Sequence, residues 1–325
     1  MKNLIDYSEK IFVAGASGMC GSAIVRKLLK HGYGKESNGG ILLTPNRKEL
    51  DLTDFNAVRN WFRVNKPTIV VFAAAKVGGI LANSTEPASF LLDNIKIQTN
   101  VIESAWLNGV KRLLFLGSSC IYPKLCKQPI KEKYLLTSEL ESTNEWYAIA
   151  KIAGLKMVES YRKQYGLKFV SVMPTNMYGP NDNYHEKNSH VLAALIKKFV
   201  IAKKDNSKIV EIWGTGKPLR EFMHVDDFSR ALLVINKKYD ENNPINVGTG
   251  EEISIKNLSK KISKLVNFKG QIKFNKKYPD GTPRKILDST KIYKLGWRPK
   301  INLEKGIKKT IKNFLNENFS NPTSK

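Results

Sequence analysis

The stretch Lys10-Ile-Phe-Val-Ala-Gly-Ala-Ser-Gly-Met-Cys-Gly21 decides the fold of this chain of 325 residues. A short apolar run at residues 10–14 leads into three glycines spaced G-x-x-G-x-x-G, and helical periodicity follows over residues 22–30. This order predicts a strand, a glycine turn and a helix. Glycines so placed let the turn bend tightly, let the backbone approach a pyrophosphate and let the helix pack on the strand.

The glycine turn predicts a dinucleotide site, because the N-terminus of the following helix would face the phosphates. A glycine turn that binds no nucleotide is the alternative, and the spacing differs from the common G-x-G-x-x-G. The predicted cofactor contacts in this stretch are Gly15, Ser17, Gly18, Met19 and Gly21.

Apolar runs and helical patterns alternate through the first half of the chain. The runs cover residues 41–43, 68–75, 113–117 and 169–173, and the helical patterns lie near residues 54–65, 90–108 and 147–165. The alternation predicts an α/β fold with a doubly wound parallel sheet that is Rossmann-like. Such sheets bind ligands at the carboxyl ends of their strands. Candidate site residues at the ends of the predicted strands, or just after them, are Ala73, Ala75, Ser118, Pro174 and Asn176.

The alternation fades after residue 174, and a smaller α+β substrate domain is predicted there. A polar loop covers residues 176–188, and a helix near 191–202, a strand near 209–213 and helices near 254–266 and 303–318 follow. We expect residues 1–175, with a return segment at about 221–250, to form an NADP-binding domain. Residues 176–220 and 251–325 are expected to form the substrate-binding domain.

The chain is strongly basic, with 54 Lys and Arg against 29 Asp and Glu, a net charge of +25 and a pI near 9.8. This charge suggests anionic partners. Of the basic residues 44 are Lys and 10 are Arg, and they are scattered, without an aromatic-interleaved basic block or a nucleic-acid module. The interpretation is a solvated, lysine-rich surface, and no nucleic-acid partner is expected.

The cysteines and the N-terminal sequence bear on the compartment. Cys20, Cys120 and Cys126 form neither a disulfide framework nor a metal-ligand spacing, which suits a reducing compartment and predicts no metal. The first ten residues lack the apolar core of a signal peptide, and no run approaches the roughly 18 apolar residues of a membrane span. We therefore expect a soluble, cytoplasmic protein without a membrane partner.

Tyr147 and Lys151 are four residues apart, so they share one face of the predicted helix. A free phenol has a pKa of about 10, and a neighbouring ammonium favours its charged form. The pair therefore predicts a reactive tyrosine that exchanges protons near neutral pH. An amphipathic helix with one aromatic and one solvated lysine is the alternative.

The segment after the second predicted strand bears on the choice of cofactor. Asp or Glu there would bind a free ribose 2′-hydroxyl, whereas this chain has Thr44-Pro-Asn-Arg47. The guanidinium of Arg47 suits a 2′-phosphate, so NADP(H) is predicted over NAD(H). Arg47 as an ordinary surface residue is the alternative.

The glycine turn, the Tyr147/Lys151 pair and Ser118 make the chain resemble the extended short-chain dehydrogenases/reductases. From about residue 10 to the end it is similar to those members that epimerise and reduce GDP-4-keto-6-deoxy-D-mannose. The matching segments are Ala75-Lys-Val-Gly-Gly79, Gly117-Ser-Ser-Cys-Ile-Tyr-Pro-Lys124, Met173-Pro-Thr-Asn-Met-Tyr-Gly-Pro180, Asn188-Ser-His190 and Arg220-Glu-Phe-Met-His-Val-Asp-Asp227. Cys120 and His190 are the specific part of this resemblance, because they separate these members from plain epimerases and dehydratases. The glycine turn departs from some members, which carry a basic residue where this chain has Ala16-Ser17.

The resemblance implies an NADPH-dependent enzyme that acts on a GDP-sugar, inverting carbons 3 and 5 and then reducing carbon 4. It also implies a homodimer formed through the helix of Tyr147 and its neighbour. The implied catalytic residues are Cys120 and His190 as acid and base, Ser118 and Tyr147 at the carbonyl oxygen, and Lys151 at the ribose. The implied substrate contacts are Lys198, Trp213, Arg220 and Lys285, with the last two at the diphosphate.

Alternatives remain at this point. A buried hydrophobic cysteine, a structural histidine and a surface salt bridge are the plain interpretations of Cys120, His190 and Arg220. Another nucleotide-sugar epimerase/reductase, such as a 4-epimerase that recycles its cofactor, is the nearest rival function. A catalytically silent NADP-sensing or nucleic-acid-associated protein is a remote one.

Overall fold

The computed structural model describes residues 4–186 and 188–319. The ends of the predicted domains, residues 1–3 and 320–325, and residue 187 of the predicted polar loop lie outside this range. No helix in the described part of the chain has the length and hydropathy needed to cross a membrane.

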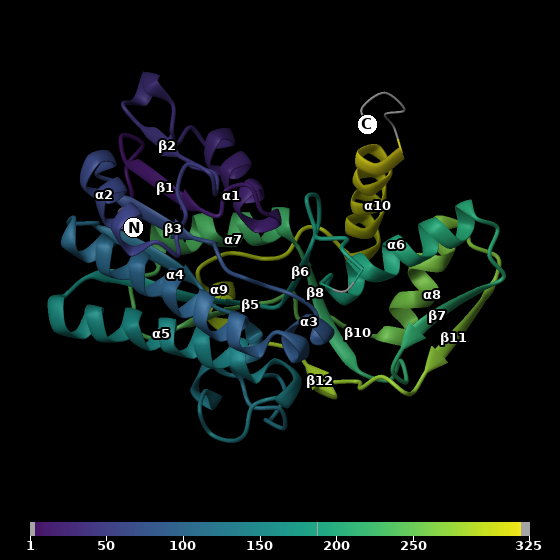
Figure 1. Cartoon of the computed structure of the whole chain (residues 1–325). Helices are drawn as coiled ribbons and strands as arrows, with labels where there is room; N and C mark the ends of the chain where they lie inside the picture. The colour runs from purple at the N-terminus through teal and green to yellow at the C-terminus, as the bar shows by residue number, and fades with distance from the viewer. Residues whose placement is uncertain (1–3, 187, 320–325) are drawn as a thin grey trace.

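A six-stranded parallel sheet forms the larger part of the molecule, with strand order β2-β1-β3-β4-β5-β9 (Figure 1). Its strands are β1 (Lys10–Ala14), β2 (Ile41–Leu43), β3 (Ile69–Phe72), β4 (Arg112–Leu116), β5 (Lys168–Pro174) and β9 (Ile245–Val247). The predicted parallel sheet is confirmed, although β3 is shorter than the predicted run at 68–75.

Helices cover both faces of this sheet, as a doubly wound fold requires. Successive strand residues point to opposite faces, so Ile11 and Val13 pack in one hydrophobic cluster while Phe12 and Ala14 pack in another. The first cluster includes side chains of α1 (Met19–Lys30) and α7 (Val225–Lys238). The second includes side chains of α2 (Phe55–Asn65), α4 (Pro87–Leu107) and α5 (Glu145–Tyr165).

The strand order creates a crevice beside β1. β1 lies between β2 and β3. The connection from β1 therefore runs to one side of the sheet, to β2, and the following connection crosses back to the other side, to β3. Ligands bind at such a switch point, outside the carboxyl ends of the strands. The turns after β1 and β3 touch there: a Cβ at Gly15 would lie 2.8 Å from the Cα of Ala74, and Gly15 has a φ of +82°. Only glycine meets both demands at this position.

A second hydrophobic core lies in the C-terminal half of the chain. It includes residues of α6 (Val191–Lys204), β7 (Ile209–Trp213), α8 (Ile255–Val266) and α10 (Leu303–Phe319). β7 pairs in parallel with β11 (Gln271–Asn275). The helices and the strand predicted for this region are present, and the predicted domain boundaries stay predictions. The remaining helices are α3 (Ile80–Thr85), α9 (Thr290–Lys294) and 3₁₀ helices at Glu36–Asn38, Ser119–Ile121, Glu132–Tyr134 and Ser142–Asn144.

A small sheet connects the two cores. β8 (Leu219–His224) pairs with β6 (Asn176–Tyr178), β10 (Glu252–Ser254) and β12 (Arg284–Lys285). The prediction of an irregular loop from residue 176 is wrong for its first three residues, because β8 supplies a partner strand. Within the predicted return segment at about 221–250, α7 packs in the first hydrophobic cluster and β9 joins the large sheet, whereas β8 belongs to this second sheet.

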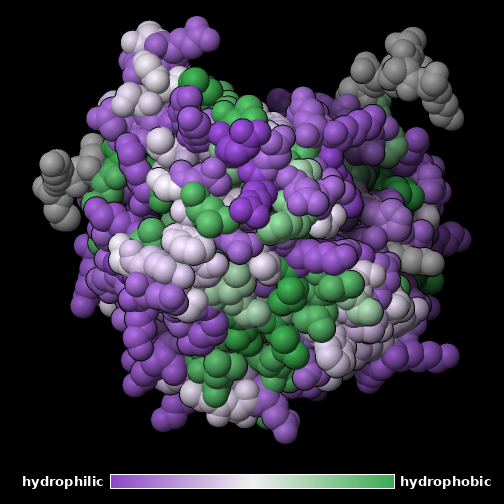
Figure 2. Space-filling view, turned by 60° about the vertical axis from the view of Figure 1, so that its left-hand side comes forward, coloured by the Kyte–Doolittle hydropathy of each residue, from purple (hydrophilic) through white to green (hydrophobic). Residues whose placement is uncertain are grey.

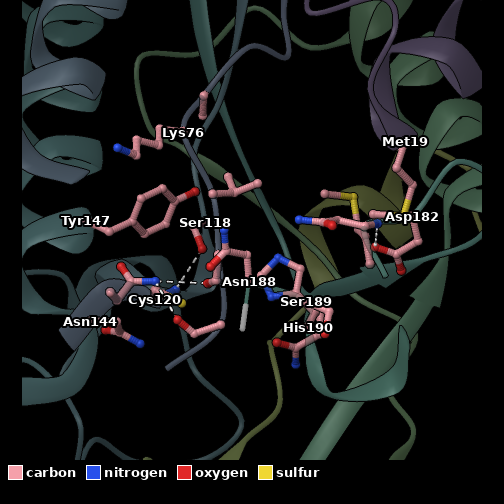
Figure 3. A pocket seen from close by; sticks show the side chains of 18 of the residues that line it. Met19, Lys76, Ser118, Cys120, Asn144, Tyr147, Asp182, Asn188, Ser189 and His190 are labelled. Carbon is pink, nitrogen blue, oxygen red and sulfur yellow. Dashed lines mark hydrogen bonds between the residues drawn. The ribbon is translucent and has the colours of Figure 1, made fainter. Parts of the chain in front are cut away.

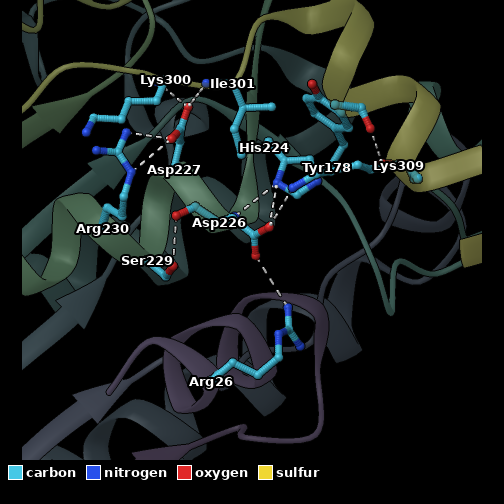
Figure 4. A network of polar contacts seen from close by, with 12 residues as sticks. Arg26, Tyr178, His224, Asp226, Asp227, Ser229, Arg230, Lys300, Ile301 and Lys309 are labelled. Carbon is cyan, nitrogen blue, oxygen red and sulfur yellow. Dashed lines mark hydrogen bonds and ion pairs between the residues drawn. The ribbon is translucent and has the colours of Figure 1, made fainter. Parts of the chain in front are cut away.

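A polar network fixes the junction of β8 and α7 (Figure 4). Asp227 is fully buried and accepts hydrogen bonds from the Arg230 guanidinium and from two backbone N–H groups of the segment that precedes α10, each at 2.8 Å. Its neighbour Asp226 forms ion pairs with Arg26 of α1 at 3.6 Å and with Lys309 of α10 at 3.7 Å. These contacts connect α1, α7 and α10, so the strand that carries Arg220 is anchored to both cores.

Candidate active site

One cavity of about 1160 Å³ opens at the carboxyl ends of the large sheet and extends to the small sheet and α6. Every residue that the sequence nominated lines it, although the roles of these residues stay predictions. They are Gly15, Ser17, Gly18, Met19, Gly21, Arg47, Ala73, Ala75, Ser118, Cys120, Tyr147, Lys151, Pro174, Asn176, His190, Lys198, Trp213, Arg220 and Lys285.

The glycine turn forms one end of this cavity and fits a dinucleotide. α1 begins at Met19, and the N–H groups of a helix's first turn have no partner within the helix. A Cβ at Gly21 would lie 2.0 Å from the carbonyl oxygen of Gly15, so the helix packs against the turn more closely than a side chain allows. The result is a compact group of N–H donors at the positive end of a helix, which suits a pyrophosphate.

Arg47 lies at the same end with its side chain 84% exposed, 3.8 Å from the carboxylate of Asp51. That carboxylate accepts the backbone N–H of Thr53 at 2.9 Å and its hydroxyl at 2.8 Å, and these hydrogen bonds lower the pKa of Asp51. With Asp51 held by Thr53, the flexible guanidinium is the group at this end that can turn toward a phosphate.

Lys151 is buried, and its ammonium donates a hydrogen bond to the carbonyl oxygen of Leu116 at 2.9 Å. Burial lowers the pKa of Lys151 to about 7. Burial also raises the pKa of Tyr147 above its ordinary 10, and a hydrogen bond with Ser118 opposes this only in part. The expectation that the ammonium favours a tyrosinate is therefore wrong here, because burial disfavours the charged phenolate and the Lys151 ammonium bonds to Leu116 instead. Tyr147 is a neutral phenol at pH 7, which is the state that a proton donor needs.

Ser118 and Cys120 lie immediately after β4, where a 3₁₀ helix begins. The Ser118 hydroxyl oxygen accepts the backbone N–H of Cys120 at 3.1 Å, so the hydroxyl proton stays free to be donated elsewhere. Figure 3 shows Ser118, Cys120 and Tyr147 on one side of the cavity and His190 on the other. Separate chain segments thus present a hydroxyl, a thiol, a phenol and an imidazole to one cavity.

His190 precedes the first residue of α6, and its ring is exposed to the cavity. Burial by the surrounding walls lowers the pKa of His190, and the positive charge of Lys285 lowers it further. The imidazole is therefore neutral near pH 7 and can accept a proton.

The far end of the cavity carries an aromatic pair and two cations. Trp213 stacks on Tyr278 with ring centroids 4.3 Å apart, and the ammonium of Lys198 lies 5.2 Å from the Trp213 ring centroid. A flat aromatic pair suits a planar base. Arg220 donates a hydrogen bond to the backbone carbonyl of Asp280 at 3.3 Å, and it forms no ion pair with any carboxylate in residues 4–186 and 188–319. The guanidinium of Arg220 is thus not held in a surface salt bridge.

The model of the NAD dependent epimerase/dehydratase family matches residues 11–248, from β1 to the residue after β9. The chain belongs to the NAD dependent epimerase/dehydratase family.

Within the NAD dependent epimerase/dehydratase family, full-length relatives are similar to this chain. GDP-L-fucose synthase 1 of Arabidopsis thaliana is 50% identical over 315 residues, which are 97% of this chain and 96% of the relative. GDP-L-fucose synthase of Escherichia coli strain K12 is 48% identical over 317 residues, covering 94% of this chain and 97% of the relative. The solved structure of a GDP-L-fucose synthetase from Naegleria fowleri bound to NADP has a TM-score of 0.86 and 29% identity, covering 97% of this chain and 96% of that one.

Sequence reasoning missed three polar residues of this epimerase/dehydratase family member. Tyr278 stacks on Trp213, and Asp182 and Asn144 each have a buried oxygen without a hydrogen-bond partner in the described part of the chain. Burial raises the pKa of Asp182 to about 7. An N-cap signal before the helix of Tyr147 would have singled out Asn144. Asp182 and Tyr278 lie in loops without any comparable signal.

Proposed function

We propose that the chain converts GDP-4-keto-6-deoxy-D-mannose to GDP-L-fucose, by inverting carbons 3 and 5 and then reducing carbon 4 with NADPH. One observation carries the proposal: Cys120 and His190 line the same cavity as the Ser118, Tyr147 and Lys151 set. The full-length similarity to two enzymes named GDP-L-fucose synthase supports the substrate. A 4-epimerase would need no thiol and imidazole of its own on the two sides of the sugar.

The inversion half of the reaction uses the ketone at carbon 4, which acidifies the protons at carbons 3 and 5. A base removes each proton from one face, and an acid returns a proton to the other face. Cys120 and His190 come from separate chain segments that line one cavity, and two groups of this kind can serve the two faces of the sugar. The hydroxyls of Ser118 and Tyr147 donate hydrogen bonds to the carbonyl oxygen while it carries the enolate charge.

The reduction half of the reaction needs a proton for the new hydroxyl at carbon 4. NADPH, when bound, supplies the hydride. Tyr147 donates the proton, because its phenol stays protonated at neutral pH. Lys151 lies on the same helix face and would hold the ribose of the cofactor, and a bound anionic cofactor would favour the charged form of Lys151.

The nucleotide ends of cofactor and substrate occupy opposite ends of the cavity in this proposal. The first turn of α1 and the glycine turn hold the cofactor pyrophosphate, and Arg47 holds its 2′-phosphate. Trp213 and Tyr278 hold the guanine by stacking, with Lys198 beside them. Arg220 binds the diphosphate through its bidentate fork.

We expect Arg47→Ala to weaken NADPH binding about tenfold, which corresponds to about 1.4 kcal/mol, and to leave NADH binding unchanged. The side chain is largely exposed, so solvent screens its attraction to the phosphate and keeps the effect modest. Titration of both cofactors by fluorescence measures the two dissociation constants. Lys48→Ala, an exposed neighbour that does not line the cavity, is the matched control. Equal affinities of the wild-type protein for NADH and NADPH would contradict the assignment.

The test of the proposed function is to incubate the protein with NADPH and GDP-4-keto-6-deoxy-D-mannose and to identify the product by NMR. GDP-L-fucose is the expected product. A GDP-6-deoxyhexose with uninverted carbons 3 and 5 would reduce the assignment to a plain reductase. A ketosugar that stays unconsumed would overturn it.

We also propose that the protein forms a homodimer through α4 and α5. Figure 2 brings the side of these helices forward, and hydrophobic side chains gather there in one area. Exposed hydrophobic residues of the two helices are Leu92, Leu107, Trp146, Ile149 and Tyr165. Patches of this kind mark interaction sites. Light scattering after gel filtration should give twice the mass of 36.7 kDa.

A cytoplasmic location is our proposal as well. It rests on the three cysteines Cys20, Cys120 and Cys126, which are free thiols. Free thiols of this kind persist in reducing compartments.

A further inference from the structure

Lys285 makes an unexpected contact with Cys120. It lies on β12, paired in register with Arg220 of β8, and only 7% of its surface is exposed. Its ammonium nitrogen lies 3.5 Å from the Cys120 sulfur, which is a hydrogen-bond contact for sulfur. The sequence predicted a diphosphate contact for this lysine, whereas the structure brings it to the thiol that the proposed function uses for proton transfer.

A buried ammonium needs hydrogen-bond acceptors or an anion to offset the loss of its hydration, as Lys151 shows with the carbonyl oxygen of Leu116. No carboxylate of residues 4–186 and 188–319 pairs with Lys285, and the acidic side chains at this end of the cavity are engaged elsewhere. Glu221 accepts two backbone N–H groups at 2.7 and 3.1 Å, and Asp280 accepts a backbone N–H and a threonine hydroxyl at 2.7 and 2.6 Å. Glu141 pairs with a lysine 3.5 Å away. The acidic group that remains in contact is the thiol of Cys120.

The position of Lys285 is fixed by contacts that do not involve a ligand. The fully buried carboxylate of Glu221, on β8, accepts the backbone N–H of Leu287, two residues after Lys285. The backbone N–H of Ile286 donates a hydrogen bond to the side-chain oxygen of Gln128 at 3.0 Å. The carbonyl oxygen of Ile286 accepts a hydrogen bond from the N–H of Ile130 at 2.8 Å. These contacts fix the backbone around Lys285, and its buried side chain reaches the Cys120 sulfur from there.

We propose that Lys285 is a positioning residue that aims the sulfur of Cys120 at the sugar ring and stabilises negative charge on that sulfur when Cys120 acts as the base. A neighbouring ammonium favours a thiolate over a thiol, and the thiolate is the form that removes a proton. In the step, the C–H bond of the substrate breaks and an S–H bond forms. The electron pair moves to the carbonyl oxygen. Burial lowers the pKa of His190 and the charge of Lys285 lowers it further, so this lysine acts on both epimerisation groups. The guanidinium of Arg220 is a second positive charge that faces Cys120.

This role rests on the proposed function, which gives the sulfur of Cys120 its task as a base. The contact between Lys285 and Cys120 is present in the protein without substrate. The test therefore uses the protein alone. Iodoacetamide alkylates thiolates, and peptide mass spectrometry reports the rate at each cysteine as a function of pH. In the wild-type protein Cys120 should react faster at pH 7 than Cys126, whose pKa is raised by burial. Cys126 is the internal control in every digest.

Lys285→Met should slow the alkylation of Cys120 about tenfold at pH 7 and move its pH profile upward by about one unit, because the ammonium no longer favours the thiolate. Lys285→Arg keeps the charge and should restore the wild-type profile. The arginine variant keeps the test decisive if Lys285→Met folds poorly. Slow alkylation of Cys120 in Lys285→Arg, with the pH profile moved upward, would overturn the proposal.

A diphosphate role for Lys285 gives a different pattern. Lys285→Met would then weaken the binding of GDP and leave the alkylation profile of Cys120 at its wild-type position, which overturns the proposal. Failure of the proposed function is distinguishable from both patterns. In that case the wild-type protein consumes no ketosugar, while the dependence of Cys120 alkylation on Lys285 is still observed.

Discussion

Tyr147→Phe is expected to slow the reduction of carbon 4 by about a thousandfold, within the range that a positioned general acid contributes. The variant removes one hydroxyl and keeps the ring, which packs at the cavity wall. The phenol of Tyr147 forms a hydrogen bond with Ser118, whereas the ammonium of Lys151 donates to the carbonyl oxygen of Leu116. The fold and the affinity for NADPH should stay close to wild type.

Loss of NADPH absorbance under single-turnover conditions measures this step, and NADPH fluorescence measures binding in parallel. Tyr161→Phe is the matched control, because Tyr161 lies on the same helix and packs against Trp106 away from the cavity. Turnover of Tyr147→Phe within a few fold of wild type would mean that another group donates the proton.

The pH dependence of reduction provides a second readout of the same residue. Burial raises the pKa of Tyr147 above its ordinary 10, so the phenol stays protonated as the pH rises from about 7 to 9. The rate at saturating substrate should therefore not decline over that interval through loss of the proton donor. A decline that disappears in Tyr147→Phe would contradict the neutral-phenol assignment.

The large sheet was predictable from the sequence because its strands are buried on both faces and read as apolar runs. β4 and β5 illustrate this, with nearly every residue buried. β6 and β12 were not predictable. They are three and two residues long and exist because β8, distant in the sequence, offers hydrogen-bond partners. A local pattern carries no information about such a partner.

The candidate site shows the same division. The residues after the strands could be nominated from the sequence, since parallel strands bring their carboxyl ends to one edge. The state of Tyr147 could not, because a charge four residues away is visible in the sequence while burial by distant segments is not. The contact between Lys285 and Cys120 joins positions 165 residues apart, so it appeared only in the structure.

Cys120→Ser and His190→Asn are each expected to slow proton exchange at carbons 3 and 5 by at least about a hundredfold. A serine hydroxyl is a far poorer base than a thiolate near pH 7, and it gives Lys285 no anion to pair with. An asparagine amide cannot accept and return a proton as the neutral imidazole of His190 does. The Ser118, Tyr147 and Lys151 set is unchanged in both variants, so hydride transfer should be much less affected.

Incubation in deuterated water with the ketosugar and oxidised cofactor isolates this exchange, because no reduction follows. Wild-type protein should introduce deuterium at both carbons, as should the control variants Cys126→Ser and His185→Asn, which alter residues outside the cavity. With NADPH added, the two cavity variants should reduce the uninverted ketosugar and give a GDP-6-deoxyhexose other than fucose. If both exchange deuterium at wild-type rates, Cys120 and His190 are structural residues, and the chain is a reductase whose epimerisation must occur elsewhere. Slow exchange at one carbon only would instead assign each residue to its own centre. In that case Cys120 would serve the inversion at one carbon and His190 the inversion at the other.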